Sequence, residues 1–338
     1  MNRSKQAGMA NKPIIVLLVG LALDGVGFAE AQQQAKVPKI GWVGARPAPR
    51  NTVSTPGREL FRRELRKLGY IEGKNVAFEY RSAENKLDRL PALADALVRL
   101  NVDVLVTGST AATIAAKNAT RTIPIVFLSG SDPVALGLVD SLARPGGNIT
   151  GFTSIGSVLA GKRLELLKET IPKLVRVAVL WNPQNPASAQ SWKESQLSAR
   201  ELGLQLHSME VSSSDKYDGA FKEAIKARSA ALAVTQSPFI NSYLTQIADL
   251  ATNNRLPTIS PRGDFVDGGG LMSYGPDQAE PYRRLASMVD KILRGAKPAE
   301  LPVEQPTKFE FVINLKTAKQ IGVTIPPNVL VRADRVIK

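Results

Sequence analysis

Hydrophobic and polar positions follow two alternating periods along this chain, and these periods predict strands and helices in turn. After Pro38, short and nearly continuous apolar runs are followed by segments in which apolar residues recur every three or four positions. Such a series predicts a parallel sheet covered by helices on both faces. In the first half, the predicted strands are Lys39–Gly44, Asn75–Tyr80, Val102–Val106 and Ile123–Leu128, and the predicted helices are Pro56–Leu68, Asp88–Leu100 and Ala111–Asn118.

The same alternation restarts after the turn sequence at residues 143–148, Ala-Arg-Pro-Gly-Gly-Asn. Two series of this kind predict an α/β protein with two doubly wound parallel-sheet lobes. In the second series, the predicted helices are Val158–Thr170, Ala187–Leu202, Lys216–Ala227, Ile240–Asn253 and Asp277–Leu293, and the predicted strands are Arg176–Trp181, Leu204–Val211, Ala231–Thr235, Pro257–Ser260, Leu271–Tyr274 and Phe309–Asn314.

The first 31 residues have the layout of a secretory signal peptide. Basic residues precede the apolar run Ile14–Leu23, and Ala29-Glu30-Ala31 has the small-x-small form of a cleavage site. The run is shorter than the ~20 apolar residues that span a bilayer. An anchored or buried helix is the alternative, but Asp24 and Gly25 interrupt the apolar pattern. We expect cleavage near Ala31 and a mature chain in the periplasm.

Composition sets further bounds on the class of protein. The 338 residues are enough for two domains, and without cysteine their stability rests on core size rather than on disulfides. The net charge of +14 raises the question of nucleic acid. On the predicted helix Pro56–Leu68, however, Arg58, Arg62 and the other basic residues lie opposite a buried stripe of Phe61 and Leu65, which predicts a solvated face. We therefore expect no nucleic-acid partner.

The carboxyl ends of the predicted strands are where a doubly wound lobe binds ligands. Trp42 closes the first strand and Asn51 lies in the loop after it; Ser109 and Thr110 follow the third strand at the start of a helix. Free amides at a helix start attract a carboxylate, although Ser and Thr there are also common caps. After the fourth strand, Ser131 and Asp132 are candidates, with Asp132 either meeting a ligand ammonium or capping a helix that begins at Pro133.

The second half offers a similar set of polar candidates. Asn182 and Asn185 follow one strand, and Gln236 and Ser237 follow another; their amides and hydroxyls suit either a ligand or ordinary turns. Tyr274 ends a later strand. Trp42 and Tyr274 could hold a flat ligand in a cleft, and burial in the core is the alternative for each.

Motifs that would indicate catalysis are missing from the sequence. His207 is the sole histidine, there is no cysteine, and no nucleophile elbow, Walker loop or metal-ligand cluster appears. We therefore predict no catalytic residues, no metal and no cofactor.

Several ordered segments resemble the substrate-binding proteins of ABC transporters in the tryptophan/tyrosine-type group. The resemblance covers nearly the whole mature chain, and it implies a type I periplasmic binding fold, with lobe 1 at 38–152 plus 276–302, lobe 2 at 153–275 plus about 306–338, and three hinge strands near 150–154, 272–275 and 302–309. The segments that carry it are Leu68–Asn75, Ile123–Phe127, Ser131–Val134, Ala143–Gly151, Gly161–Leu167, Arg176–Pro183, Gly268–Gly275, Leu301–Phe309 and Ile325–Pro327.

The resemblance also implies a function. It predicts a periplasmic solute-binding protein of an ABC importer that captures a small polar or amino-acid-like ligand, aromatic in the better-known branch of the family, by closing its lobes. It implies an inner-membrane permease as partner, and we expect a monomer. Two alternatives stay open from the sequence. One is a two-lobed Rossmann-like enzyme, for which a complete glycine fingerprint is missing; the other is a periplasmic ligand sensor.

Overall fold

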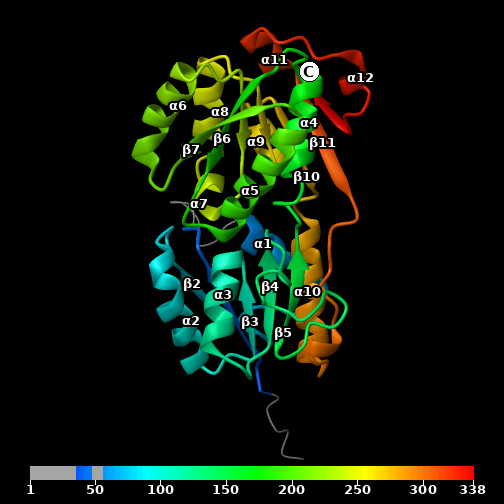
Figure 1. Cartoon of the computed structure of the whole chain (residues 1–338). Coiled ribbons are helices and arrows are strands. Elements are labelled where there is room, and N and C mark those ends of the chain that lie inside the picture. The colour runs from blue at the N-terminus through cyan, green and yellow to red at the C-terminus, as the bar shows by residue number, and fades with distance from the viewer. Residues whose placement is uncertain (1–35, 48–55) are drawn as a thin grey trace, which may run out of the picture. The chain divides into compact units, whose positions relative to one another are not determined.

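Two helix-covered sheets make up the part of the chain that the computed structural model describes, residues 36–47 and 56–338 (Figure 1). The predicted signal peptide and Asn51 lie outside these residues. The first sheet has the strand order β2-β1-β3-β4-β5, and all its neighbours pair in parallel. Its elements are β1 Lys39–Gly44, α1 Pro56–Lys67, β2 Ala77–Ser82, α2 Leu90–Arg99, β3 Val104–Thr107, α3 Thr110–Ala119, β4 Ile125–Ser129 and β5 Ile149–Thr153, and α10 Glu280–Leu293 packs on them from later in the chain.

Helices bury apolar side chains on both faces of this sheet. Side chains of α2 and α3 pack with Val43 of β1 on one face, whereas α1 and α10 pack with Ile40 and Trp42 of the same strand on the other. Successive residues of a strand point to opposite faces, so a strand covered on both sides must be apolar at nearly every position. This is why the buried strands β1, β3 and β4 appear as nearly continuous apolar runs.

The second sheet contains seven strands in the order β12-β11-β10-β9-β8-β6-β7. β10 and β11 pair antiparallel, and the other neighbours pair in parallel. Its elements are α4 Ala160–Thr170, β6 Arg176–Trp181, α5 Pro186–Glu201, β7 Gln205–Glu210, α6 Tyr217–Lys226, β8 Ala231–Val234, α7 Pro238–Asn241, α8 Leu244–Asn253, β9 Thr258–Ser260, α9 Gly263–Asp267, β10 Met272–Pro276, β11 Phe309–Asn314, α11 Leu315–Ile321, α12 Pro327–Leu330 and β12 Arg335–Ile337.

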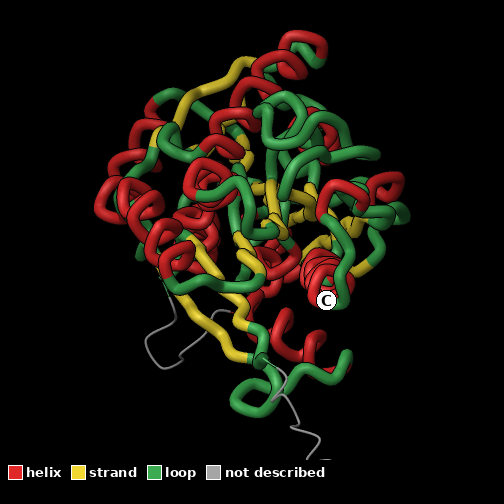
Figure 2. Tube along the Cα trace, turned by 90° about the horizontal axis from the view of Figure 1, so that it is seen from below, coloured by secondary structure: helices red, strands yellow, loops and turns green. Residues whose placement is uncertain are grey.

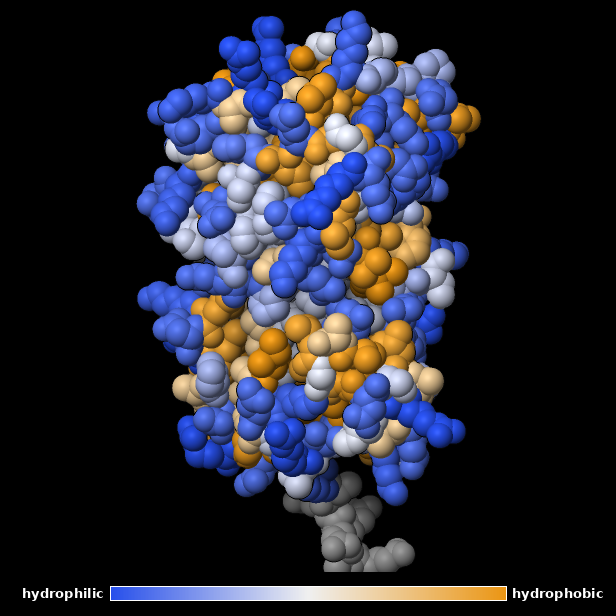
Figure 3. All heavy atoms as spheres, in the orientation of Figure 1, coloured by the Kyte–Doolittle hydropathy of each residue, from blue (hydrophilic) through white to orange (hydrophobic). Residues whose placement is uncertain are grey.

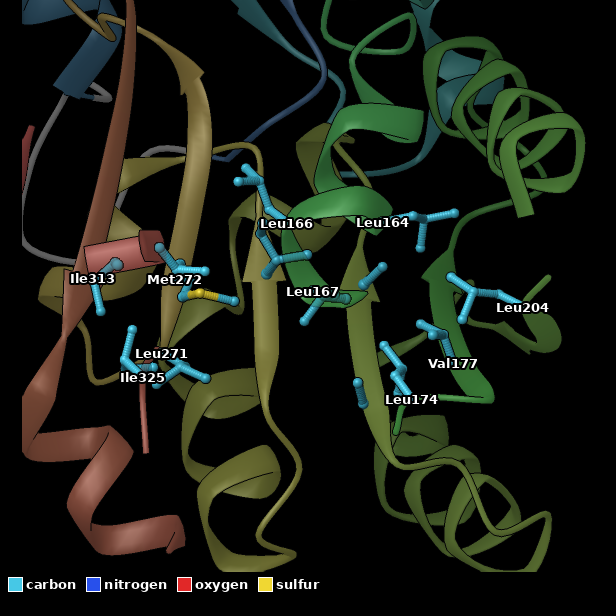
Figure 4. Close-up of a cluster of buried hydrophobic side chains, with 14 of the residues drawn as sticks. Leu164, Leu166, Leu167, Leu174, Val177, Leu204, Leu271, Met272, Ile313 and Ile325 are labelled. Atoms are coloured by element: carbon cyan, nitrogen blue, oxygen red, sulfur yellow. The ribbon is translucent and has the colours of Figure 1, made fainter. Parts of the chain in front are cut away.

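Alternate residues of β6 divide the core of this lobe into two layers. Val177 and Val179 pack with the leucines of α4, as the close-up in Figure 4 shows for Val177, Leu164 and Leu167. Ala178 and Leu180 instead face α6, α7, α8 and α9. In the view of Figure 2, several strands lie in the middle among helices and loops, whereas others run along the outer edge. The structure thus shows the predicted pair of helix-covered, mainly parallel sheets.

Three local predictions differ from the structure. The helix predicted from Asp88 begins as α2 at Leu90, because Asp88 lies in a 3-10 turn, Leu87–Arg89. The predicted helix Ile240–Asn253 is two helices, because Tyr243 leaves the helical conformation and its ring packs against Tyr217 and Phe239, with centroids 5.8 and 5.1 Å away.

Arg58 is the third difference. It was expected on a solvated face of α1, yet it is buried, with its guanidinium 4.8 Å from the centre of the Tyr80 ring. The cation–π contact explains how a charged residue occupies this position. Other polar residues of the helix agree with the expected solvated face, since Arg62 pairs with Glu59 at 3.1 Å and Lys67 with Glu64 at 2.9 Å.

Three chain segments cross between the two sheets, and hydrogen bonds connect them to one another. Phe152 of β5 pairs with Glu304, so the first crossing lies beside the third. The guanidinium of Arg163 on α4 donates to the carbonyls of Tyr274 and Gly156, both at 2.9 Å, and so connects the first and second crossings. Arg163 is 3% exposed and has no carboxylate partner among the described residues, and burial lowers its pKa to about 9.

The surface shows hydrophilic side chains over much of the face in Figure 3, with smaller apolar patches between them. Across residues 36–47 and 56–338, none of the helices combines the length and the apolar character needed to cross a bilayer.

Candidate binding site

A cavity lies where strand ends of both sheets meet. Its walls come from the segments that follow β1, β3, β4 and β5 in the first lobe and β6, β8, β9 and β10 in the second. The space between its walls is about 730 Å³, a volume that includes the part open to solvent. Residues that line it are Arg46, Gly108, Ser109, Thr110, Leu128, Ser129, Gly130, Ser154, Asn185, Ala187, Gln236, Ser237, Pro238, Asn241, Arg262, Pro276, Gln278, Pro281 and Tyr282.

Capping residues of three helices supply part of the polar lining. The side chains of Ser109, Asn185 and Ser237 accept backbone N–H groups of α3, α5 and α7, at 3.3, 3.1 and 3.1 Å. Capping uses the oxygen of each side chain as an acceptor. The hydroxyl hydrogens of the two serines and the amide hydrogens of Asn185 therefore remain available as donors.

A buried hydroxyl cluster supports the first-lobe wall. Thr110 Oγ1 lies 2.9 Å from Ser129 Oγ and 3.4 Å from Ser131 Oγ, and it accepts the backbone N–H of Gly130 at 3.3 Å. Ser131 is fully buried behind the wall. These bonds fix the loops after β3 and β4 against each other.

Two side-chain oxygens at the cavity have no hydrogen-bond partner in the described protein. Ser154, directly after β5, is 5% exposed, and its Oγ bonds to none of the described residues. Asn241, at the end of α7, leaves its Oδ1 unpaired in the same way. Buried polar atoms are nearly always hydrogen-bonded, so unpaired atoms at a cavity wall indicate where a ligand or water binds.

Arg46 and Arg262 bring positive charge to the cavity. The guanidinium of Arg262 donates to both carboxylate oxygens of Asp264, at 2.9 and 2.5 Å. Burial lowers the pKa of Arg262, but the bonds and charge of Asp264 outweigh it, and the net shift is upward. Within residues 36–47 and 56–338, Arg46 donates to the carbonyl of Asn241, at 3.3 Å, and its Nε has no partner there. Burial, and after it the charge of Arg262, lowers the pKa of Arg46.

The structure brings five of the candidates predicted from sequence together at this cavity. Ser109 and Thr110 line it from the first lobe, and Asn185, Gln236 and Ser237 line it from the second. Trp42 is 6% exposed and belongs to the first-lobe core, but it also lines a smaller hollow beside the cavity.

The other predicted residues lie behind the cavity lining. Asp132 Oδ1 accepts the N–H groups of Val134 and Ala135, so it caps a turn, and no helix follows at Pro133. Asn182 is buried and accepts the N–H of Gln184. Tyr274 packs against the rings of Phe309 and Phe311.

Sequence reasoning did not select Arg46, Ser154, Arg262, Gln278 or Tyr282 as site residues. Arg262 follows β9 by two positions, so the strand-end rule could have found it. Ser154 follows β5, a strand that was read only as a hinge. Gln278 and Tyr282 lie around the start of α10, where the chain returns from the second lobe and packs on the first. The strand-end rule does not single out such positions, so the sequence did not indicate them.

Contacts across the cavity hold the lobes together in this structure. Arg46, after β1, reaches the carbonyl of Asn241 in α7, and the backbone N–H of Asp132 donates to Gln190 of α5 at 3.3 Å. The cavity is therefore bounded by touching lobes rather than by one lobe alone.

A two-lobed α/β fold with a ligand-sized cavity between strand ends defines a protein of the type I periplasmic binding class. Residues 53–337 match the family model described as ABC transporter substrate binding protein, and the chain belongs to this family. The family consists of binding proteins, so the protein is a substrate-binding protein rather than an enzyme.

Known relatives agree with this assignment. The chain is 27% identical over 261 residues to a tyrosine-binding protein of Clostridioides difficile, which is 77% of this chain and 75% of that protein. An ABC domain of Streptococcus pneumoniae solved in complex with L-Trp is 26% identical, with a TM-score of 0.77 over 89% of this chain and 99% of that one. A ligand-free, open substrate binding protein of Clostridium difficile is also 26% identical over the same shares, with a TM-score of 0.62.

Proposed function

We propose that this protein captures a small organic ligand for an ABC importer by closing its two lobes around it. The observation that carries the proposal is the cavity, whose polar lining comes from both lobes and includes the unpaired Ser154 hydroxyl. Ligand contacts from both sides would favour the closed form over the open one, which is the differential binding that closure requires.

Comparison with the relatives supports closure. At equal identity and equal coverage, the chain superposes better on the L-Trp complex than on the ligand-free, open protein, with TM-scores of 0.77 and 0.62. The direct contacts of Arg46 and Asp132 across the cavity agree with a closed arrangement. The linked crossings around Arg163 would then act as the hinge.

The place of action follows from the predicted export signal. We propose that residues 1–31 direct the chain to the periplasm, where it works as a monomer and delivers ligand to an inner-membrane permease. Sequencing the amino terminus of the mature protein from its own cells checks this, and cleavage near Ala31 is expected. Soluble protein that retains Met1 would contradict export through this signal.

Native mass spectrometry tests ligand capture. Protein purified without denaturation should carry an additional small-molecule mass, which is lost on mild unfolding. Bare protein in these spectra, together with no rise in melting temperature across a panel of small organic acids and amino acids, would contradict the proposed function.

A further inference from the structure

We propose that the ligand is an organic acid with an apolar body and no ammonium group, rather than a zwitterionic amino acid. This rests on the proposed function and narrows its ligand class. The argument begins with the charges that the described residues place at the cavity.

Arg46 and Arg262 are the charged residues in the described cavity lining, which contains no Asp, Glu, Lys or His. Asp264 compensates Arg262 by its paired bonds, whereas Arg46 has no carboxylate partner among the described residues. Residues 48–55 are outside the described part, and their sequence contains no acidic residue either. Arg46 is partly exposed, and Asp264 acts on it by its charge without a hydrogen bond between the two among the described residues. Taking a charge out of water is costly, so an anion bonded to Arg46 in the cavity would offset that cost.

The neighbouring acidic residue on α10 does not change this balance. Glu280 is 8% exposed and lies at the helix start, but it is not part of the cavity lining. Its Oε1 lies 3.6 Å from Arg284, its buried Oε2 has no hydrogen-bond partner among the described residues, and the residue borders a separate surface hollow. The Glu280 carboxylate is therefore not among the groups that line the cavity beside Arg46.

Hydrogen-bond capacity at the wall also favours an anion. Ser109, Asn185 and Ser237 each use one lone pair of the side-chain oxygen for their helix, and they keep all their hydroxyl or amide hydrogens as donors for a ligand. An ammonium group needs acceptors for three N–H bonds. Asn241 Oδ1 is an unpaired acceptor at the wall, but the carbonyl of the same residue already receives Arg46, so an ammonium there would lie beside a positive charge.

Apolar groups complete the lining. Pro238, Pro276 and Pro281 come from three different segments, and Leu128 and the ring of Tyr282 join them. Such a wall suits the hydrocarbon or aromatic part of a ligand. The Arg46 guanidinium, which has no bonded carboxylate among the described residues, adds a site for an anion. Together they fit a ligand with a carboxylate attached to a ring-sized apolar body.

Two matched series of compounds test the inference by calorimetry on the mature chain after removal of retained small molecules. They are hydrocinnamate, L-phenylalanine and phenethylamine, and indolepropionate, L-tryptophan and tryptamine. In each series the acid should bind at least about tenfold more tightly than the amino acid, the scale of one charge-assisted interaction, and the amine should not bind.

Variants locate the effect. Arg46→Gln should weaken binding of the acid by about tenfold to a hundredfold, and Arg46→Lys should recover part of it. Arg121→Gln is the matched control: this exposed arginine lies in the turn between α3 and β4, a helix length away from the cavity, and its change should leave affinity unaltered.

Amino acids that bind as tightly as their acids, or amines that bind at all, would overturn the inference and leave the proposed function standing. Full affinity in Arg46→Gln would also overturn it. If none of the six compounds binds, the ligand class is wrong, and native mass spectrometry then decides separately whether the protein retains any ligand.

Discussion

Hydroxyl groups at the cavity differ in how much the protein already uses them. Ser109 and Ser237 cap helices, so their loss would change stability and ligand binding together. Ser154 is only 5% exposed, yet its Oγ has no hydrogen-bond partner in the described protein. A change at Ser154 can therefore alter ligand binding without altering stability.

Ser154→Ala should weaken ligand binding without destabilising the ligand-free protein. One lost hydrogen bond predicts a fall in affinity worth about 0.5–1.5 kcal/mol, or about 1.5–3 kcal/mol if the ligand atom is charged. Calorimetry and thermal unfolding measure the two quantities. In the matched variant Ser109→Ala, stability should fall as well, by about 1 kcal/mol. A destabilised Ser154→Ala with normal affinity would assign the hydroxyl a structural role.

Asp132 offers the opposite case, a candidate from sequence whose carboxylate is occupied by its own turn. Asp132→Asn should leave ligand affinity unchanged, because Asn caps nearly as well and the side chain does not line the cavity. Asp132→Ala should lower stability by about 0.5–2 kcal/mol. A large loss of affinity in Asp132→Asn would mean that the ligand reaches this carboxylate.

At the scale of elements, the sequence predicted where strands lie better than which side chains line the cavity. β1, β6 and β11 begin and end at the predicted residues, since an apolar run covered on both faces is an unambiguous pattern. β5 was predicted only as a hinge. The break between α7 and α8 depends on Tyr243, whose ring packs on the nearby Phe239 and on Tyr217 of the preceding helix α6. Arg46 and Arg262 meet at the cavity through tertiary structure, which local patterns do not encode.

The second crossing is closely packed, and this predicts its response to substitution. A methyl group on Gly275 would lie 2.0 Å from the carbonyl oxygen of Pro261, so the backbone would have to move. Gly275→Ala should therefore lower the free energy of unfolding by about 1–3 kcal/mol.

Gly219 is the matched control for Gly275. It is exposed within α6 and has open space where the methyl group would lie, so Gly219→Ala should raise stability by about 0.5–1 kcal/mol. Urea unfolding compares the two variants. If Gly275→Ala and Gly219→Ala had the same free energy of unfolding, the close packing at the second crossing would be contradicted.

At the scale of the whole molecule, the proposed function makes closure of the two lobes around the ligand the step that the importer would recognise. The lobes share three crossing segments and contact each other across the cavity through Arg46 and Asp132. Ligand bonds to both sides would add to these contacts, so the ligand-bound protein should be held in one arrangement and the ligand-free protein should sample wider ones.

Electron spin distance measurement between labels on the two lobes tests the central claim most directly. The chain has no cysteine, so Lys86→Cys and Lys222→Cys, at exposed positions before α2 and in α6, would carry the labels without background. Spectra are compared without ligand and at saturation with the tightest-binding compound of the two calorimetric series. We predict a shorter and narrower distance distribution with ligand. Identical distributions at full saturation would contradict capture by lobe closure.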